Sequence, residues 1–457
     1  MIGIIMFFTA LFMLLIGFPV AFTFGAVSVV FGIIAGIVEI YRYADPDMSL
    51  TSILIDGFSE GMFMFDFMPH RIWSIMNNTI LMAVPMFIFM GIILQKTGLA
   101  ERLLESMGFL FGEVRGGVAI STVLVGTLLA ASTGVVGASV VAMGVISLPV
   151  MLKYKYNTEL ATGTICASGT LGQIIPPSIV LIILGDVFQV PVGDLFKAAV
   201  WPGLMLVAAY ILFILIVSFV KKDMAPAIPA DPSRGSKSKQ VVKALIDIIP
   251  SLTLIILVLG SIFAGVATPT ESAAVGCLGA LLLSIMYKTF SNSTVKEAAL
   301  ESVKITSMVF AILIGATAFS MVFTYTGGDQ LVEHFMMNLP GDEKLGFILF
   351  TMLAIFVLGF FIDFVEISYI IVPILVPIAT NLDINPVWFA ILIAMNLQTS
   401  FLTPPFGFSL FYLKGVVPAT VRTIQIYKGV LPFIIIQILI LALLALYPEI
   451  FGIQSTL

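Results

Sequence analysis

Apolar residues fall into long uninterrupted segments along this chain, and charged residues are largely confined to the connections between them. A helix needs about 20 apolar residues to cross a bilayer. Segments of comparable length lie at residues 2–18, 20–38, 72–94 and 192–220 in the first half and at 241–267, 271–286, 305–323 and 430–446 in the second. This pattern predicts an all-α polytopic membrane protein.

The connections predict the parts of the chain that lie outside the bilayer. Residues 41–70 include five acidic residues and predict a mixed extramembrane loop. Residues 98–112 and 296–304 place charged side chains opposite apolar ones at helical spacing, which predicts amphipathic helices, the first of them an arm on the membrane surface. Residues 222–240 are rich in charge and proline and predict a linker between two halves, residues 1–221 and 241–457.

Two other apolar runs predict helical hairpins. Residues 116–152 lie between Arg115 and the basic pair Lys153 and Lys155, and basic residues at both ends place both ends on one side of the membrane. The midpoint carries no charged residue, Trp or Tyr that would sit at a far interface, so a re-entrant hairpin is predicted. Two full spans with a very short loop are the alternative. Residues 344–381 form the second candidate hairpin.

Each candidate hairpin is followed by an apolar segment that contains two consecutive prolines. The segment 159–190 contains Pro176 and Pro177, and the segment 386–417 contains Pro404 and Pro405. A proline removes one helical hydrogen bond and its ring displaces the preceding turn, so both segments are predicted to be broken helices. Paired breaks point to the binding site of a transporter, because broken backbone in a bilayer must be buried in protein or line a cavity. A simple packing kink is the alternative for either break alone.

The halves repeat one plan. Three prolines of the first half recur 228 positions later in the second half, and these pairs are Pro149 and Pro377, Pro176 and Pro404, and Pro177 and Pro405. Sequence identity between the halves is otherwise low, so the predicted repeat is one of architecture.

The basic residues predict the orientation of both halves. Of the 21 Lys and Arg residues, 17 fall on one predicted side, and the other four are Arg42, Arg71, Lys197 and Lys344. The side rich in basic residues is cytoplasmic, so the linker is predicted to be cytoplasmic and the N-terminus external. The first hairpin then opens toward the cytoplasm and the second opens outward. Such inverted-topology repeats are the plan for alternating access around a central site.

Composition excludes most other classes of protein. Hydrophobic residues make up 60% of the 457, charged residues only 10%, and mean hydropathy is +1.15, whereas a soluble domain has about 25% charged residues. The net charge of −5 is too diffuse to indicate a nucleic-acid partner. The sequence shows no metal-ligand spacing and no arrangement of catalytic residues, and Cys166 and Cys277 are predicted core residues. No cofactor is expected.

The breaks and the hairpin tips supply the candidate binding residues. Carbonyl and hydroxyl oxygens freed at a helix break suit an alkali cation, and half-helix N-termini suit an anionic substrate. The first predicted cation site comprises Ser132, Thr133, Gly134, Gly172, Ile175 and Pro177, and the second comprises Asp363, Gln398, Thr399, Ser400 and Thr403. The residues predicted to bind the anionic substrate are Ser168, Thr170, Asn396 and Thr399.

Each of these assignments has a plain alternative. A Ser or Thr hydroxyl can bond back to its own helix instead of binding a ligand. Asp363 and Glu366 are the only acids within the second hairpin, and a charge in the membrane interior is functional by default. In a shallower hairpin, both acids would face water.

Three motifs resemble those of a known family. They are residues 131–137 (ASTGVVG), 169–178 (GTLGQIIPPS) and 398–407 (QTSFLTPPFG). In this respect the chain resembles the large membrane subunit, of the DctM type, of tripartite ATP-independent periplasmic (TRAP) transporters in the ion-transporter superfamily. The resemblance covers nearly the whole chain.

The resemblance implies an elevator-type secondary transporter, driven by sodium, that takes up a small organic acid across the bacterial inner membrane. It implies sodium ions as the coupling ions, a small four-helix membrane subunit of the DctQ type and a periplasmic substrate-binding protein of the DctP type. Because Met1 lies directly before the first apolar segment, a separate small subunit is expected. The alternatives are a stand-alone sodium–anion symporter or sodium/proton antiporter of related fold and, less favoured, an intramembrane enzyme with Asp363 and Glu366 as an acid pair.

Cysteine labelling tests the predicted topology. A single cysteine at Arg234 or Lys237 is expected to react only from the cytoplasm, and one at Asp342 or Asp383 only from the periplasm, because of the distribution of basic residues. An impermeant thiol reagent applied to intact cells and to inverted vesicles measures this. Labelling of all four positions from one side would contradict the inverted repeat.

Overall fold

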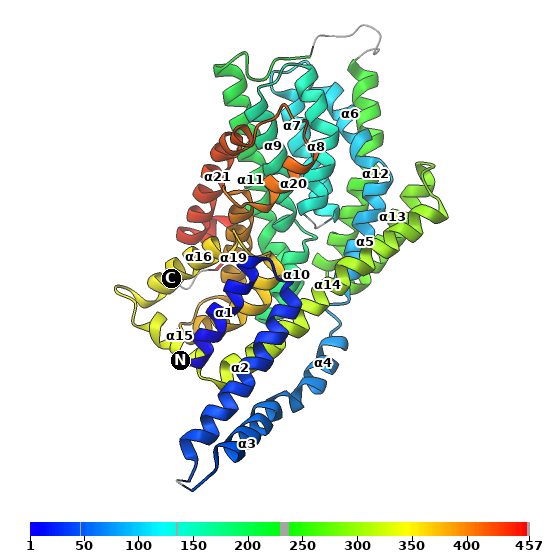
Figure 1. Cartoon of the computed structure of the whole chain (residues 1–457). Coiled ribbons are helices and arrows are strands. Elements are labelled where there is room, and N and C mark those ends of the chain that lie inside the picture. The colour runs from blue at the N-terminus through cyan, green and yellow to red at the C-terminus, as the bar shows by residue number, and fades with distance from the viewer. Residues whose placement is uncertain (46, 134–135, 229–236, 455–457) are drawn as a thin grey trace.

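The structure is a computed structural model that describes residues 1–45, 47–133, 136–228 and 237–454, with the backbone alone at 99, 100, 109, 131–133, 237–240 and 243. Every regular element within these residues is a helix (Figure 1). Eight helices in the described part of the chain are long and apolar enough to cross a membrane. The predicted all-α polytopic class is therefore confirmed.

The first half begins with six helices, which are α1 (Ile2–Ile16), α2 (Val20–Tyr43), α3 (Leu50–Phe63), α4 (Met68–Met76), α5 (Ala83–Lys96) and α6 (Leu99–Phe111). The helix α1 has only 15 residues and ends at Gly17, whose φ of 100° lies in the left-handed region that favours glycine. The short 3₁₀ helix η1 (Met64–Phe67) joins α3 to α4.

The prediction of a mixed loop over residues 41–70 was wrong, because α3 starts at Leu50 and packs along α2. Ser49 caps this helix by accepting a hydrogen bond from the Ser52 amide at 3.1 Å. The acidic Asp56 is exposed, whereas Gly57 and Gly61 are buried against α2. Asp56 thus lies on the exposed face of a helix and not in an irregular segment.

The prediction of one span over residues 72–94 was also wrong. The helix α4 ends at Met76, and α5 begins only at Ala83. Asn78 interrupts the helix, since its Oδ1 accepts hydrogen bonds from the amides of Ile80 at 2.9 Å and Leu81 at 3.4 Å. An Asn side chain that bonds to nearby amides in this way favours a turn over a continued helix.

The arm helix α6 bends by 57° from α5 and packs on the protein. Its apolar residues Leu103, Leu104 and Met107 are buried, and α6 contacts α7 and α12. On its polar face, the Arg102 guanidinium lies 5.0 Å from the centre of the Tyr287 ring, a cation–π distance. The predicted amphipathic helix is therefore present, with its apolar face against neighbouring helices.

The rest of the first half contains α7 (Gly117–Thr133), α8 (Val136–Lys153), α9 (Thr158–Thr170), the 3₁₀ helix η2 (Leu171–Gln173), α10 (Ile179–Phe188) and α11 (Val192–Val220). The second half starts with α12 (Lys237–Phe263), α13 (Pro269–Met286), α14 (Asn292–Tyr325) and α15 (Gly328–Met337). It continues with α16 (Glu343–Leu358), α17 (Phe364–Glu366), the π-helical turn η4 (Ile367–Ile371), α18 (Val372–Asn381), α19 (Pro386–Leu402), α20 (Phe408–Val416), α21 (Thr423–Leu446) and the 3₁₀ helix η5 (Pro448–Phe451).

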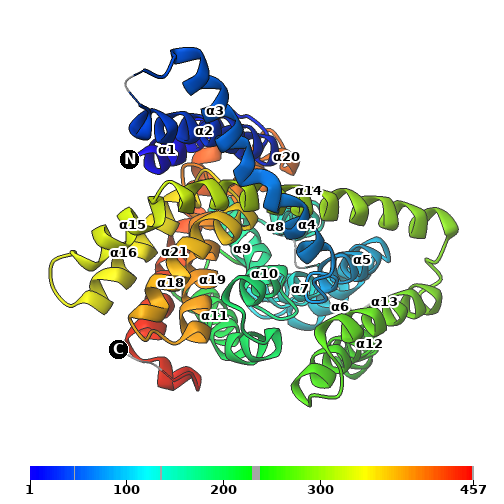
Figure 2. The ribbon, with the colours of Figure 1, turned by 90° about the horizontal axis from the view of Figure 1, so that it is seen from below.

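One long helix replaces two predicted elements. The predicted amphipathic segment 296–304 and the predicted span 305–323 both lie in the continuous 34-residue helix α14. Figure 2 shows α14 running across the molecule, with α4 beside it. Near its start, Lys96 of α5 forms ion pairs with Glu297 at 3.3 Å and Glu301 at 3.6 Å.

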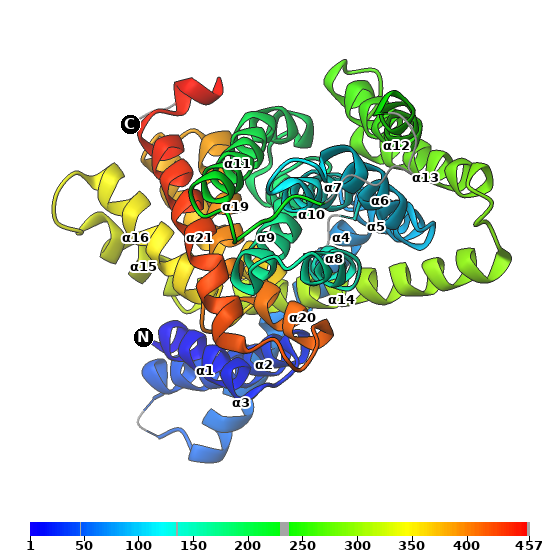
Figure 3. The same cartoon turned by 90° about the horizontal axis from the view of Figure 1, so that it is seen from above.

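The centre of the molecule is formed by α9 and α19, the helices that precede the double prolines. Every residue of Leu160–Thr170 and of Trp388–Leu402 is buried. Figure 3 shows α9 among α7, α8, α19 and α21, all of which contact it. The backbones of α9 and α21 meet at Gly163 and Gly429, where a Cβ on either glycine would overlap the backbone of the other helix. The double prolines therefore follow the two most buried helices.

The packing of α3 on α2 depends on glycine. A Cβ on Gly36 would lie 2.8 Å from Gly61 Cα, and a Cβ on Gly61 would lie 2.6 Å from Gly32 O. Gly36→Ala is therefore expected to lower stability by about 1–3 kcal/mol through overpacking. Thermal unfolding of the purified protein measures the effect. Gly25→Ala on the same helix, with no neighbouring atom within 4 Å of its Cβ, is the control, and equal behaviour of the two variants would refute the proposed packing.

Candidate functional site

The first break lies between α9 and α10. The helix α9 ends at Thr170, η2 follows, and the Pro176–Pro177 peptide bond is cis. The Ser178 hydroxyl donates a hydrogen bond to the Gln173 carbonyl at 2.6 Å and accepts one from the Leu181 amide at 3.4 Å. One side chain thus satisfies a carbonyl before the break and an amide after it.

The second break has the same construction. The helix α19 ends at Leu402, the Pro404–Pro405 bond is cis, and α20 begins at Phe408. The Ser409 hydroxyl donates to the Phe401 carbonyl at 2.8 Å. Positions 173 and 401, whose carbonyls the two serines bind, are 228 residues apart, which is the offset of the double prolines. Both helices are therefore interrupted where the prolines predict it.

Each break lies against one of the candidate hairpins. A Cβ on Gly172 of η2 would lie 2.8 Å from the Ala130 carbonyl oxygen near the end of α7. A Cβ on Gly359, just after α16, would overlap the Ser400 side chain on α19. Only glycine permits these approaches, so the first break lies close to the backbone of α7 and the residue after α16 lies close to Ser400 of α19.

Aromatic rings hold the second hairpin on the second break. The centres of the Phe364 and Phe401 rings are 6.4 Å apart, and those of Phe361 and Phe406 are 5.3 Å apart. Phe408 continues this cluster at 5.0 Å from Phe401. Residues 359–364 therefore lie directly beside residues 400–408.

The predicted hydroxyl ligands whose side chains the structure describes bond back to their own helices. Thr399 Oγ1 donates to Met395 O at 2.9 Å, Ser400 Oγ to Leu397 O at 2.8 Å and Thr403 Oγ1 to Thr399 O at 2.7 Å. On the other central helix, Ser168 Oγ donates to Ile165 O at 3.1 Å and Thr170 Oγ1 to Ala167 O at 2.9 Å. A hydroxyl that donates its hydrogen keeps lone pairs, so these oxygens can still accept a hydrogen bond or coordinate a cation.

The remaining predicted residues fall into three groups. Asn396 Nδ2 donates to Met352 O at 2.6 Å and ties α19 to α16. Ile175 lies against Gly203 of α11. The side chains of Ser132 and Thr133 lie outside the described residues, as does Gly134 entirely, so those three predicted ligands have no described geometry.

Two acids lie one helical turn apart after the tip of the second hairpin. Asp363 is partly exposed and caps α17, with Oδ1 accepting from the Phe364 amide at 2.7 Å. Glu366 is only 5% exposed, and its Oε2 has no hydrogen-bond partner within the described part of the chain. The π turn η4 follows at once, and π turns within helices are frequent at functional sites.

Two buried glutamines at the breaks differ from the hydroxyl residues in having no hydrogen-bond partner among the described residues. Gln173 and Gln398 are both fully buried, and neither amide group has a partner among the described residues. An unmade hydrogen bond on a buried polar group costs about 1–3 kcal/mol, so these amides are suited to bind a polar ligand. Gln398 was predicted from the sequence. Gln173 was missed, although it occupies the same break as Gly172.

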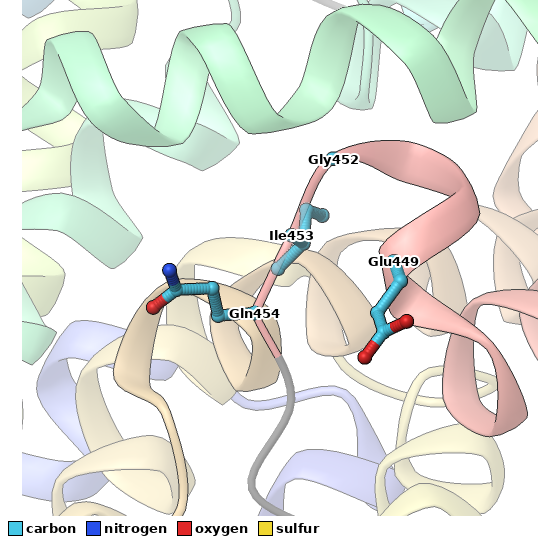
Figure 4. A pocket seen from close by; sticks show the side chains of 4 residues that line it. All are labelled: Glu449, Gly452, Ile453 and Gln454. Atoms are coloured by element: carbon cyan, nitrogen blue, oxygen red, sulfur yellow. The ribbon is translucent and has the colours of Figure 1, made fainter.

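A pocket of about 420 Å³ lies at the end of the described chain and is lined by Glu449, Gly452, Ile453 and Gln454 (Figure 4). It contains none of the break residues. Within the described residues, no group of three His, Cys, Asp or Glu side chains could hold a metal ion. The two breaks and the hairpin turns beside them are therefore the candidate site.

A solved structure identifies the fold. The chain resembles the YdaH transporter of Alcanivorax borkumensis, with a TM-score of 0.64 and 12% sequence identity over 93% of this chain and 98% of that one. At this identity the likeness concerns the fold alone, which is that of a polytopic membrane protein.

The sequence then identifies the family. The family model for the DctM component of tripartite ATP-independent periplasmic transporters matches residues 6–450. The chain is 32% identical to the C4-dicarboxylate TRAP transporter large permease protein DctM of Pseudomonas aeruginosa, over 83% of this chain and 87% of the relative. It is 30% identical to the sialic acid TRAP transporter large permease protein SiaM of Vibrio cholerae, over 82% and 85%. The chain belongs to the DctM family, which confirms the resemblance, and it is a transport protein and not an enzyme.

The contact between Gly359 and Ser400 yields a test of the site's geometry. Gly359→Ala is expected to lower the unfolding midpoint, because the new methyl group overlaps Ser400, at a cost of about 1–3 kcal/mol. Adding Ser400→Gly should restore much of the loss, since coupled residues in contact are non-additive. Gly415→Ala, with no atom within 4 Å of its Cβ, is the control. A double variant as unstable as Gly359→Ala would contradict the contact.

Proposed function

We propose that this protein is the large membrane subunit of a sodium-coupled transporter that takes up a small organic acid across the bacterial inner membrane. The observation that carries the proposal is the pair of helices α9 and α19, buried over Leu160–Thr170 and Trp388–Leu402 and each followed by a double proline. The end of α7 lies close to the first break, and the residue after α16 lies against α19. Broken helices in matching places of two halves are the arrangement in which secondary transporters bind ions and substrate.

The cation is proposed to bind where the hairpin turns meet the breaks. Hydroxyl and carbonyl oxygens are hard ligands that suit sodium, and Thr399, Ser400 and Thr403 retain lone pairs beside the second break. Asp363 adds a carboxylate at the facing hairpin turn, where it can offset the charge of the ion. Ser132, Thr133, Gly134, Gly172, Ile175 and Pro177 are the proposed counterparts at the first break.

The organic anion is proposed to bind between the two breaks. Gln173 and Gln398 offer amide groups that can each donate and accept, and Asn396 keeps its Oδ1. Ser168, Thr170 and Thr399 remain the proposed hydroxyl contacts. Relatives of this chain are named for C4-dicarboxylates and for sialic acid, so a small carboxylate is the proposed class of substrate.

The subunit is proposed to act with two partners. Its family is the DctM component of a tripartite system, and the proposed partners are a four-helix membrane subunit of the DctQ type and a periplasmic binding protein of the DctP type. The proposed mechanism is an elevator, in which the two hairpins and the broken helices move together past α2 and α14. Two inverted repeats, 1–221 and 241–457, with the linker 222–240 in the cytoplasm, would give the site access to each side in turn.

Uptake by proteoliposomes tests this proposal. The protein is reconstituted with its small subunit, and the cognate binding protein is added with its radiolabelled ligand. Uptake is expected to rise at least tenfold when an inward sodium gradient replaces an equal potassium gradient, and to cease without the binding protein. Equal uptake with sodium and potassium would exclude sodium coupling, and uptake without the binding protein would favour a stand-alone symporter.

Asp363 yields the sharpest single-residue prediction for transport. Asp363→Asn is expected to abolish sodium-driven uptake, because it removes the carboxylate at the turn of the second hairpin while keeping an oxygen that can cap α17. Binding of the periplasmic protein should be unchanged. Asp342→Asn, which alters the cap of α16 outside the site, is the control. Near-normal uptake by Asp363→Asn would show that this acid is a solvated residue without a role in coupling.

A further inference from the structure

A large cavity with a mixed apolar and polar lining lies apart from the two breaks, between the α3–α4 segment and α14. Its volume is about 1060 Å³, slightly above the range of roughly 300–1,000 Å³ that is typical of small-molecule sites. The exposed residues His70 and Arg71 lie on one wall, and Tyr369, which is only 5% exposed, lies on another. The cavity therefore extends from an exposed basic region to a buried hydroxyl group.

The wall formed by α14 carries hydroxyl groups along one face. Thr317, Ser320 and Thr324 all line the cavity, and their spacing of three and four residues places them on one side of the helix. Thr317 Oγ1 donates to Leu313 O at 2.8 Å, so its oxygen remains an acceptor toward the cavity. This face is suited to a ligand that has several polar groups.

The opposite wall comes from elements next to the breaks. Asp186 lies near the end of α10, the half-helix that follows the first break, and Tyr369 lies in the π turn of the second hairpin. The Asp186 carboxylate accepts a hydrogen bond from Asn78, which fixes its position. The Tyr369 hydroxyl has no partner among the described residues. A buried hydroxyl that lines a cavity and has no protein partner is suited to bind a ligand.

The charges in the cavity narrow the class of ligand. The Arg71 side chain ends in a planar guanidinium group that matches a carboxylate in shape and charge. Asp186 and Glu60, which both line the cavity, repel a bare anion but accept hydrogen bonds from a hydroxyl or ammonium group. A ligand that satisfies both kinds of residue has a carboxylate at one end and hydrogen-bond donors elsewhere.

We propose that this cavity binds a small carboxylate that carries hydroxyl or amino groups, with Arg71 on the carboxylate and Asp186 on a donor group of the ligand. This inference rests on the proposed function, because it makes the cavity a second site for the transported acid before it reaches the breaks. It adds a specificity rule: hydroxylated acids bind here more tightly than plain dicarboxylates of similar size.

Protection of an introduced cysteine tests the site without any transport. Ser320→Cys, in a background with Cys166→Ala and Cys277→Ala, is labelled with a small thiol reagent in phosphatidylcholine nanodiscs. The probes are gluconate, malate and N-acetylneuraminate, with succinate as the acid without hydroxyl groups. At least one hydroxylated acid is expected to slow labelling tenfold or more, at concentrations where succinate has little effect. Equal labelling with all four acids overturns the proposal.

Variants separate the two recognition roles. Arg71→Gln should weaken protection at least tenfold, and Arg71→Lys should keep part of it. Arg42→Gln, an exposed arginine at the end of α2 outside the cavity, is the matched control. Asp186→Asn should reduce the ratio of the protection given by hydroxylated acids to the protection given by succinate. Unchanged protection in Arg71→Gln, with the same unliganded labelling rate, contradicts the assignment of Arg71.

Two controls distinguish the other outcomes. If phosphatidylglycerol nanodiscs alone slow labelling as strongly as the acids do, the occupant is a lipid headgroup and the proposal fails. Protection of the cysteine is measured without sodium and without partner subunits. It can therefore be observed even if the uptake assay shows no sodium coupling. Loss of protection with intact sodium-driven uptake would reject the cavity and leave the proposed function standing.

Discussion

A helix that breaks inside a membrane must find partners for its freed backbone groups within the protein, since lipid offers none. The rest of this structure is arranged around that constraint. The two helices that precede the double prolines are buried over Leu160–Thr170 and Trp388–Leu402, and a serine beyond each break binds a carbonyl before it. Tyr427 adds a further bond to Pro405 O at 2.9 Å. The breaks are supported by side chains from several elements and so can keep a defined shape.

Close backbone approach is the second condition for such a site. Gly172 lets η2 lie close to α7, and Gly359 lets the residue after α16 lie against α19. Gly163 and Gly429 let α21 lie directly on α9. In a membrane, burial of apolar surface gives helices no driving force to associate, so their close packing depends on small residues at the contact. The side chains of Gln173, Gln398 and Ser400 are consequently fully buried in protein, which is what binding of a dehydrated ion would require.

The sequence predicts the central features because they depend on residues with few conformational options. Two consecutive prolines cannot continue a helix, and the structure breaks both helices there. The errors have another origin. The acids of residues 41–70 suggested a loop, although Asp56 and Glu60 lie within α3, and Asn78 ends a helix inside an apolar run that resembled one span. Gln173 and the cavity beside Arg71 were missed because burial and partnerless atoms arise only from tertiary packing.

Equilibrium binding of radioactive sodium to the purified protein tests the central claim, that the breaks form the ion site, most directly. The account predicts saturable binding that weakens at least tenfold when Thr399→Ala and Thr403→Ala are combined. Binding should persist in Thr380→Ala, whose hydroxyl makes the same bond to its own helix, at 2.9 Å, but lies on α18 away from the breaks. Equal sodium affinity in the wild-type protein and the Thr399→Ala/Thr403→Ala variant would contradict the account and place the ions elsewhere.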